Sequence, residues 1–364
     1  MNSNLSSICD YRKEKIEVSA LDLSTFISTE NMLPNRGGIT LAASLPTTAQ
    51  TQAFFRGDVL VSNIRPYFKK IWQATFDGGC SNDVLVFTAR PGVQNAFLYY
   101  ILSDDEFFAY AMATSKGTKM PRGDKTAIMN YQVPTFGERE QKCIAGILRS
   151  LDDKIELNNR MNENLEQQAQ TLFNSWFIDF DPYGGVCPAS WKQGTLADIA
   201  NITSGKRPPV KSAERTDTAV IPLVGAAAVM GYTTEANHCD KILVTGRVGT
   251  HGVVQRFNSP CWTSDNTLVI TSDFYEYTYQ ILQRIDYHSM NRGSTQPLIT
   301  QGDMNKVKIL IPDQATISAF EIIAGQLMQK NEANHKENEH LATIRDTLLP
   351  MLMTGVIDSS SIDI

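Results

Sequence analysis

A heptad pattern of side chains constrains the fold of this chain more than any other feature. Between Glu138 and Phe177 the seam positions are spaced alternately four and three residues apart. This spacing predicts a long helix packed against a partner helix. At the α-helical rise, such a helix is a rod about 60 Å long. The seam consists of Ile144, Leu148, Leu151, Ile155, Asn158, Asn162, Leu165, Ala169, Leu172 and Trp176.

Turn and cap residues mark the ends of this helix. Thr135 followed three residues later by Glu138 is the pattern of a capping box before the helix. The stretch 181–185, Asp-Pro-Tyr-Gly-Gly, is expected to end it, because Pro and Gly continue a helix poorly.

A second seam lies 176 residues further along the chain. Asp313 is a candidate N-cap for its helix, and Gly355 lies just past the end. Three seam positions differ in kind between the copies, so the two helices are related but not interchangeable. The second seam consists of Phe320, Ala324, Leu327, Asn331, Asn334, Asn338, Leu341, Arg345, Leu348 and Leu352.

Two asparagines recur at equivalent seam positions. Asn158 and Asn162 of the first copy correspond to Asn334 and Asn338 of the second. A buried Asn in a seam can fix the register, because a misaligned Asn loses its hydrogen-bond partner. The alternative is that these residues lie at a frayed or solvated edge. We expect the register role, since both positions are repeated.

The segments between the seams also repeat. A shift of 183 residues aligns the expected strand 59–62 with 242–245, and the loop at Gly117 corresponds to Gly293. Between these anchors the loops differ widely, as in modules that recognise different targets; duplication followed by drift would give the same picture. The predicted boundaries are 1–137 for the first domain, 138–181 for the first long helix, 182–312 for the second domain, 313–357 for the second long helix and 358–364 for a tail.

This order predicts the architecture. The two ends of a domain usually lie close together, so the second domain receives one long helix and starts the next from nearly the same place. The predicted fold is α+β: two globular α/β domains held apart by two long antiparallel coiled-coil helices, with pseudo-two-fold symmetry.

Composition excludes several classes of protein. The sequence contains no run of eighteen apolar residues, so no membrane span is predicted. The first residues lack the pattern of a signal peptide, and we therefore expect a cytoplasmic protein. Six scattered Cys without a CxxC pair and five dispersed His predict no zinc site. Residues 138–181 and 313–364 carry net charges of −4 and −5 and the rest of the chain carries +3, which permits DNA binding by the domains.

The expected shape suits double-helical DNA. Successive sites on one face of DNA lie about 34–36 Å apart, and a rod pair of this length can hold two small domains roughly that far apart. Because the domains differ, the predicted target is two unlike half-sites separated by a gap that is not recognised.

The long-helix residues resemble a known family. The stretches 152–159, 162–166, 169–173 and 176–177 are similar to the central conserved region of the specificity (S) subunit of type I restriction-modification enzymes. Residues 341–355 resemble the distal conserved region of that family. The resemblance covers nearly the whole chain. One departure from the family is that the first domain begins with a shorter edge segment than the second. This difference would weaken the binding of the first half-site.

The resemblance implies a non-catalytic DNA-specificity subunit with two target-recognition domains. It would bind an asymmetric bipartite site in double-stranded DNA and recruit two modification (M) subunits, which bind S-adenosylmethionine and methylate adenine. Restriction (R) subunits, which use ATP and Mg and cut DNA, would join the complex. No cofactor is expected in this chain itself.

The chain's own motifs agree with a non-enzyme. Asp181-Pro182-Tyr183 has one Pro where an amino-methyltransferase loop needs two, and Gly205-Lys206 lacks the earlier glycine of a P-loop. Neither a nuclease carboxylate cluster nor a Ser/His/Asp arrangement can be inferred, so no catalytic and no metal residue is predicted. The alternatives are a coiled-coil protein–protein scaffold without sequence-specific DNA binding, and an enzyme with an uncatalogued site.

Candidate DNA contacts are basic or amide side chains in the variable loops. Arg and Lys neutralise phosphates, and Arg and Gln bind base edges; each could also be a solvated surface group. The candidates in the first domain are Arg65, Lys69, Lys70, Lys116, Lys119, Arg122 and Lys125. Those in the second domain are Lys206, Arg207, Lys211, Arg247, His251, Arg256, Arg292, Gln296 and Gln301.

Large apolar residues crowd the far end of each long helix, more than a two-helix seam can cover. We expect the excess to bind the M subunits; the alternative is packing against the neighbouring target domain. The candidate partner-binding residues are Phe173, Trp176, Phe177, Leu348, Leu349 and Leu352.

Overall fold

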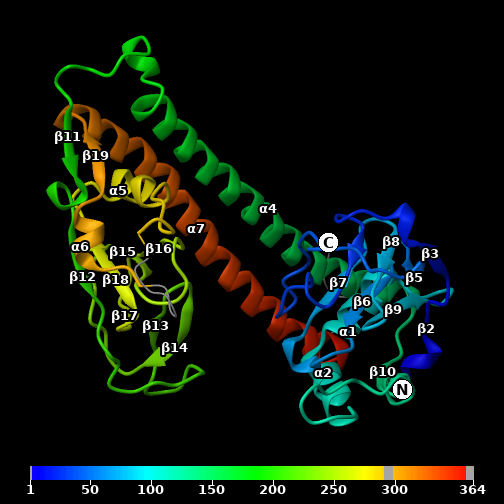
Figure 1. Cartoon of the computed structure of the whole chain (residues 1–364). Coiled ribbons are helices and arrows are strands. Elements are labelled where there is room, and N and C mark those ends of the chain that lie inside the picture. The colour runs from blue at the N-terminus through cyan, green and yellow to red at the C-terminus, as the bar shows by residue number, and fades with distance from the viewer. Residues whose placement is uncertain (1, 291–297, 358–364) are drawn as a thin grey trace. The chain divides into compact units, whose positions relative to one another are not determined.

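The computed structural model describes residues 2–290 and 298–357. The chain divides into two compact units, Met1–Asn158 with Lys336–Ile364 (unit 1) and Asn159–His335 (unit 2). Each unit holds one mixed α/β domain and half of each of two long helices (Figure 1). The mixed class and the pair of long helices confirm the predicted fold class.

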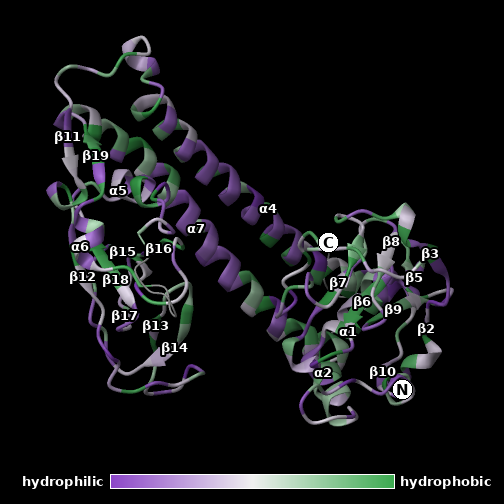
Figure 2. Cartoon of the chain, in the orientation of Figure 1, coloured by the Kyte–Doolittle hydropathy of each residue, from purple (hydrophilic) through white to green (hydrophobic). Residues whose placement is uncertain are grey.

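The two long helices lie within the predicted segments 138–181 and 313–357. α4 spans Glu138–Phe177 and α7 spans Gln314–Met353, 40 residues each. In the described part of the chain they pack antiparallel, because residue numbers rise along α4 while those of the contacting residues in α7 decrease. The pairs are Asp152–Arg345 and Asn158–Asn338 in unit 1 and Asn162–Asn334 in unit 2. The middle of both helices is mainly hydrophilic, unlike the domain sheets (Figure 2).

Asparagine pairs join the two helices, as the seam pattern predicts. In unit 1 the Asn158 side chain is fully buried and donates to Asn338 Oδ1 at 2.9 Å. In unit 2 Asn334 donates to Asn162 Oδ1 at 2.8 Å, and both residues are buried. Each pair joins the first Asn of one seam to the second Asn of the other. The interpretation as a frayed edge is therefore wrong.

The helix ends differ in part from the prediction. The Thr135–Glu138 capping box is not formed; instead Gly137 N–H donates to Glu140 Oε2 at 2.8 Å, one turn into the helix. α4 ends at Phe177, before the predicted stop, and Phe180 follows with a positive φ of 57°.

The second long helix has the predicted caps. Asp313 caps the start of α7 by accepting from Thr316 N–H at 3.0 Å. Its carboxyl end closes at Gly355, whose φ is 72°; Gly355 N–H donates to Leu352 O and Val356 N–H to Met351 O. This is the hydrogen-bond pattern of a Schellman motif.

The two domains share one sheet topology. The main sheet of unit 1 has the order β2-β9-β6-β7 and that of unit 2 has β12-β18-β15-β16, antiparallel throughout. The unit 1 strands are β2 (Cys9–Tyr11), β9 (Val84–Ala89), β6 (Val59–Ser62) and β7 (Ile71–Gln73). Those of unit 2 are β12 (Asn201–Ser204), β18 (Thr267–Thr271), β15 (Ile242–Gly246) and β16 (Gln255–Phe257). The predicted equivalence of 59–62 with 242–245 is confirmed.

Smaller sheets complete each domain. The second sheet of unit 1 runs β3 (Lys15–Glu17), β5 (Gln50–Phe54), β8 (Gly78–Cys80) and β4 (Phe26–Ile27). That of unit 2 runs β14 (Val229–Thr233), β13 (Ile221–Val224) and β17 (Trp262–Thr263). Two-stranded ribbons lead into the long helices: β1 (Asn2–Asn4) with β10 (Gln132–Pro134), and β11 (Lys192–Thr195) with β19 (Lys308–Ile311).

These ribbons limit the expected shortening of the first edge to one residue. A 3-10 turn follows β1 at Leu5–Ser7 and β11 at Leu196–Asp198, and Leu5 and Leu196 are both fully buried. The first domain therefore has the same edge strand and turn as the second, although β1 pairs over three residues and β11 over four.

Helices cover the sheets and fix each domain to the long helices. Unit 1 carries α1 (Asn95–Ser103), α2 (Asp105–Ala113) and α3 (Lys125–Ile128); unit 2 carries α5 (Tyr275–Leu282) and α6 (Gln301–Asn305). Gln141 of α4 accepts from Gln94 N–H at the start of α1, at 3.1 Å. Glu321 of α7 accepts from Glu276 and Tyr277 N–H at the start of α5, at 3.1 and 2.7 Å. In both units a long-helix side chain thus caps a domain helix.

Candidate nucleic-acid interface

The main sheets position two loop clusters, one in each unit. In unit 1 the loop that follows β6 is bonded to the loop before α3: Arg65 N–H donates to Pro121 O at 2.8 Å, and Ile64 forms a bridge with Arg122. In unit 2 the loop that follows β15 is bonded to the loop before α6: Ile299 N–H donates to Arg247 O at 3.0 Å. Topology thus brings together loops that the sequence predicts separately.

A third loop completes the cluster of unit 1. Asn35 N–H donates to Phe68 O at 2.8 Å, and Arg36 N–H donates to Lys69 O at 3.0 Å. We call the loops 33–38, 64–70 and 114–124 the unit 1 cluster. Asn35 and Arg36 were not predicted as part of it; the Pro-Asn-Arg-Gly-Gly run at 34–38 is the turn signal that could have drawn attention to them.

The backbone of this cluster is strained. Asn35, Arg36, Arg65 and Lys69 have φ between 50° and 61°, in the left-handed region that residues other than glycine seldom occupy. Among the described residues, only one further non-glycine residue has a positive φ. Such strain persists only where surrounding contacts enforce it, and it concentrates at functional sites. In the corresponding loop of unit 2 the residues with positive φ are glycines, Gly249 and Gly252, at φ 84° and 83°.

The predicted cations of unit 1 have unequal access to a ligand. Lys70 turns inward: its ammonium donates to Thr29 O at 2.6 Å, and burial lowers its pKa. Lys69 pairs with Asp105 at 2.8 Å. Arg65 is half-buried, and its Nε lacks a hydrogen-bond partner within the described part of the chain. Lys70 therefore has a partner within the domain, and its role as a DNA contact stays a prediction, whereas the Arg65 guanidinium still has a donor to satisfy.

The loop before α3 carries exposed cations. Lys116 pairs with Asp124 at 2.5 Å, and this hydrogen bond raises the pKa of Lys116 and lowers that of Asp124. Arg122 pairs with Asp83 at 3.1 Å. Lys119 and Lys125 are exposed, and no ion pair holds either side chain among the residues described. The surface is basic, although nearby carboxylates partly neutralise it.

Unit 2 has a matching cluster formed by residues 204–211, 247–253 and 298–301. Gln301 at the start of α6 donates to Ser204 Oγ at 2.9 Å, and Lys206 N–H donates to Thr263 O at 2.9 Å. Lys206, Arg207 and Lys211 are exposed. This unit 2 cluster therefore gathers three of the predicted cations with Gln301.

Gly205 allows the close approach of two loops in this cluster. A Cβ on Gly205 would lie 2.1 Å from Ser264 O, so only glycine fits. Nearby, burial lowers the pKa of His238, and the charge of Lys206 lowers it further. His238 was not predicted as a neighbour of this cluster.

The remaining predicted residues of unit 2 have different positions. His251 is half-buried with Nδ1 3.1 Å from Gly246 O. Arg256 is largely buried: it pairs with Glu276 at 2.7 Å and stacks on Tyr275 and Tyr279, and its role as a DNA contact stays a prediction. Arg292 and Gln296 lie outside the described residues.

The predicted partner-binding residues mostly belong to domain cores. Phe173 and Phe177 are buried in unit 2 against Tyr277, Trp191 and Phe320, and Leu349 and Leu352 are buried in the core of unit 1. These four side chains therefore pack against the neighbouring domain, as the alternative held. Trp176 and Leu348 are only half-buried and remain candidates for a partner surface.

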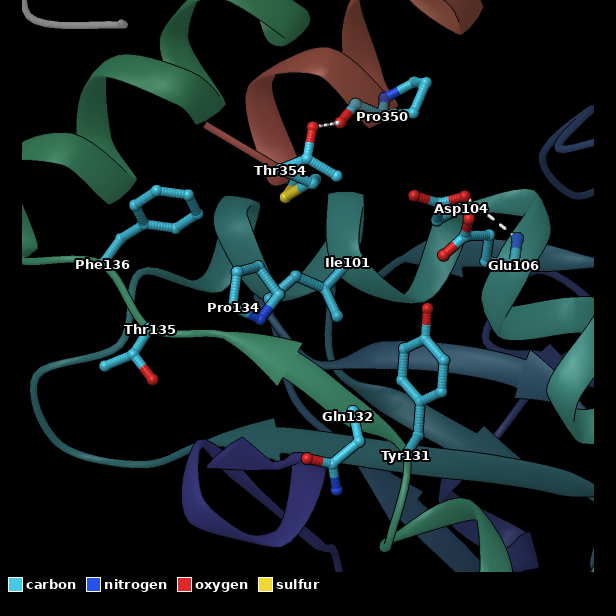
Figure 3. A pocket seen from close by; sticks show the side chains of 11 residues that line it. Ile101, Asp104, Glu106, Tyr131, Gln132, Pro134, Thr135, Phe136, Pro350 and Thr354 are labelled. Atoms are coloured by element: carbon cyan, nitrogen blue, oxygen red, sulfur yellow. Dashed lines mark hydrogen bonds between the residues drawn. The ribbon is translucent and has the colours of Figure 1, made fainter. Parts of the chain in front are cut away.

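A pocket in each unit lies beside the last domain strand. In unit 1 its volume is about 400 Å³, and the Tyr131 hydroxyl points toward Asp104 and Glu106 (Figure 3). Asp104 accepts from Glu106 N–H at 3.0 Å, and burial raises its pKa. The unit 2 pocket, about 420 Å³, is mainly apolar and is lined by residues that include Phe177. Carboxylates repel phosphate, so the unit 1 pocket does not extend the basic surface.

Other site types find no support in the described residues. No group of three or more His, Cys, Asp or Glu is placed there to hold a metal ion. No helix within 2–290 or 298–357 has the length and apolar character needed to cross a membrane.

Comparison with known proteins identifies the class to which this fold belongs. The family model described as type I restriction modification DNA specificity domain matches residues 4–167 and again residues 188–343. The chain therefore belongs to the family of type I restriction-modification specificity subunits. The two matches correspond to the two halves of the internal repeat.

Individual relatives agree with this assignment. The chain is 26% identical to the MjaIX specificity subunit of Methanocaldococcus jannaschii, over 73% of this chain and 70% of that protein. It is 24% identical to the HindI specificity subunit of Haemophilus influenzae, over 97% and 98%. The crystal structure of an S subunit from M. genitalium has a TM-score of 0.59 at 19% identity, over 97% and 96% of the two chains, which shows a shared fold.

Proposed function

We propose that this chain binds an asymmetric, bipartite site in double-stranded DNA, with one half-site for each domain. The observation that carries this proposal is the pair of loop clusters at equivalent positions of one sheet topology. Their side chains differ: unit 1 presents Lys116, Lys119 and Arg122, and unit 2 presents Lys206, Arg207 and Lys211 together with the amide of Gln301. Equivalent position with unlike side chains fits two different half-sites.

The long helices would set the distance between the half-sites. A 40-residue helix is about 60 Å long, and successive major-groove sites on one face of DNA lie about 34–36 Å apart. The paired asparagines fix the register of α4 against α7, so the spacing would be fixed as well.

The catalytic steps would belong to partner subunits. We propose that two M subunits, which would bind S-adenosylmethionine, join this chain, and that R subunits, which would use ATP and Mg, join that complex. Half-buried Trp176 and Leu348 are the candidate contacts that remain for M. Purification of the tagged chain from cells that also produce M tests this step; a chain that purifies alone contradicts it.

Removing the exposed cations of unit 1 tests DNA contact by its cluster. The triple variant Lys116→Ala, Lys119→Ala, Arg122→Ala is expected to weaken specific binding, because a phosphate that is no longer neutralised keeps its counterions. The slope of log affinity against log salt concentration should become shallower by about 1 for each such phosphate. Titrations of the complete complex with the target duplex at several salt concentrations measure both.

A matched control separates this effect from a general change in charge. Lys13→Ala, Arg139→Ala, Lys142→Ala also removes three exposed cations from unit 1, but outside the cluster. It should leave the salt dependence close to that of the wild type. Equal slopes for the two triple variants would contradict the assignment.

A further inference from the structure

Two neighbouring aromatic side chains are exposed on the unit 1 cluster. Tyr67 is 50% exposed and Phe68 is 38% exposed, and their ring centroids are 4.6 Å apart. Large aromatic rings contribute most to stability when they are buried, so an exposed pair indicates a surface that binds a partner.

The backbone beneath the pair is held in place. Pro66–Phe68 form a 3-10 turn between two left-handed residues, Arg65 and Lys69. Three hydrogen bonds fix this turn: Arg65 N–H donates to Pro121 O at 2.8 Å, Phe68 O accepts from Asn35 N–H at 2.8 Å, and Lys69 O accepts from Arg36 N–H at 3.0 Å. The rings are therefore presented by a rigid support and do not simply lie on a loose loop.

The groups beside the pair favour nucleic acid over protein as the partner. Arg65 precedes the turn with a buried Nε that nothing in the described chain satisfies, and Lys119 is exposed on the adjoining loop. Every base offers a flat face to an aromatic ring, and phosphates offer acceptors to the cations. Apolar side chains inserted between base steps unstack them and kink the duplex.

The equivalent loop of unit 2 lacks this feature. Residues 247–253 contain no Phe, Tyr or Trp and place Gly249 and Gly252 where unit 1 has its turn. The two loops therefore differ in aromatic side chains as well as in cations.

We propose that Tyr67 and Phe68 form an aromatic wedge that enters a base step of the half-site bound by unit 1 and unstacks it, whereas unit 2 binds its half-site without unstacking. This inference rests on the proposed function. It makes part of the sequence preference depend on how easily a step deforms, in addition to hydrogen bonds with base edges.

The test is the fluorescence of 2-aminopurine placed singly at each adenine of the target duplex other than the methylated ones, because a methyltransferase extrudes the base that it modifies. The complete complex with M subunits should increase the fluorescence at one or more positions of one half-site and at none of the other. Tyr67→Ala/Phe68→Ala should remove this increase and weaken specific binding about tenfold or more, because loss of aromatic stacking on bases has effects of this size. Both rings are exposed, so the fold is expected to be retained.

The matched control is Phe55→Ala, which removes an exposed aromatic ring of unit 1 that lies outside both clusters. It should leave both the fluorescence and the affinity unchanged. Specific binding of the wild type without any fluorescence increase would overturn the wedge and leave the proposed function intact; absence of specific binding would overturn both. A double variant that binds DNA normally but loses M would also overturn the wedge, because the pair would then be a protein contact.

Discussion

Phe177→Ala is expected to lower the free energy of unfolding of unit 2 by about 3–5 kcal/mol, the usual cost of removing a buried aromatic ring. Phe177 is 3% exposed and contacts the rings of Phe173, Trp191, Tyr277 and Phe320, with centroids 4.9–5.7 Å apart. These partners come from the second domain and from both long helices. The substitution would therefore open a cavity where that domain joins α4 and α7.

The urea dependence of amide hydrogen exchange in β15 and β18 measures this effect within unit 2. Ile178→Ala is the control, because Ile178 follows Phe177 directly and is 54% exposed. It should change the free energy by less than about 1 kcal/mol. Equal effects of the two substitutions would show that Phe177 is not a core residue. Because replacing a core residue destabilises unit 2, loss of M binding by a Phe177 variant would not show that Phe177 itself contacts M.

Arg345→Ala is expected to destabilise unit 1 by about 2–3 kcal/mol, because it leaves a largely buried carboxylate without its counter-charge. Arg345 of α7 contacts Asp152 Oδ1 of α4 at 2.7 Å, and Tyr100 of α1 donates to Asp152 Oδ2 at 2.7 Å. The side chains of Arg345 and Asp152 are 17% and 26% exposed. One ion pair therefore joins both long helices and the domain.

A double-mutant cycle with Asp152→Asn isolates the charge interaction, because Asn keeps an acceptor for Tyr100. In that background Arg345→Ala should cost less than about 1 kcal/mol, since no unpaired charge is left behind. Hydrogen exchange in β6 and β9 measures the four free energies. Additive effects would contradict the interpretation. The equivalent positions of unit 2, Ala169 and Met328, are both buried and carry no charge, so an ion pair is not required at this position of the fold.

The regular parts of this fold were predictable from the sequence. Periodicity determined the extents of α4 and α7, and the strand 59–62 was predicted with its bounds. The apolar periodicity of residues 95–110 predicts a single helix, but the structure has two, because Asp104 leaves the helical region and its side chain caps α2. The Ser-Asp-Asp run at 103–105 is a helix-start signal, but the surrounding apolar periodicity concealed it.

The site was less predictable, because its contacts link residues far apart in sequence. Lys70 and Arg256 look like surface cations, yet their partners Thr29 and Glu276 lie 41 and 20 residues away. The left-handed conformations of Arg65 and Lys69 have no local signal either, because neither is a glycine or an asparagine. Hydrogen bonds from the loops 33–38 and 114–124 enforce them, and only the tertiary structure brings these loops together.

The central claim is that this chain selects the DNA site at which its M partner methylates adenine. Methylome sequencing of cells with and without this gene, with M present, tests it most directly. We expect a methyladenine motif of two unlike halves with a fixed gap, which disappears on deletion and returns when the gene is restored. An unchanged methylome would contradict the claim, and a chain that still binds M in those cells would then be a scaffold without sequence-specific DNA binding.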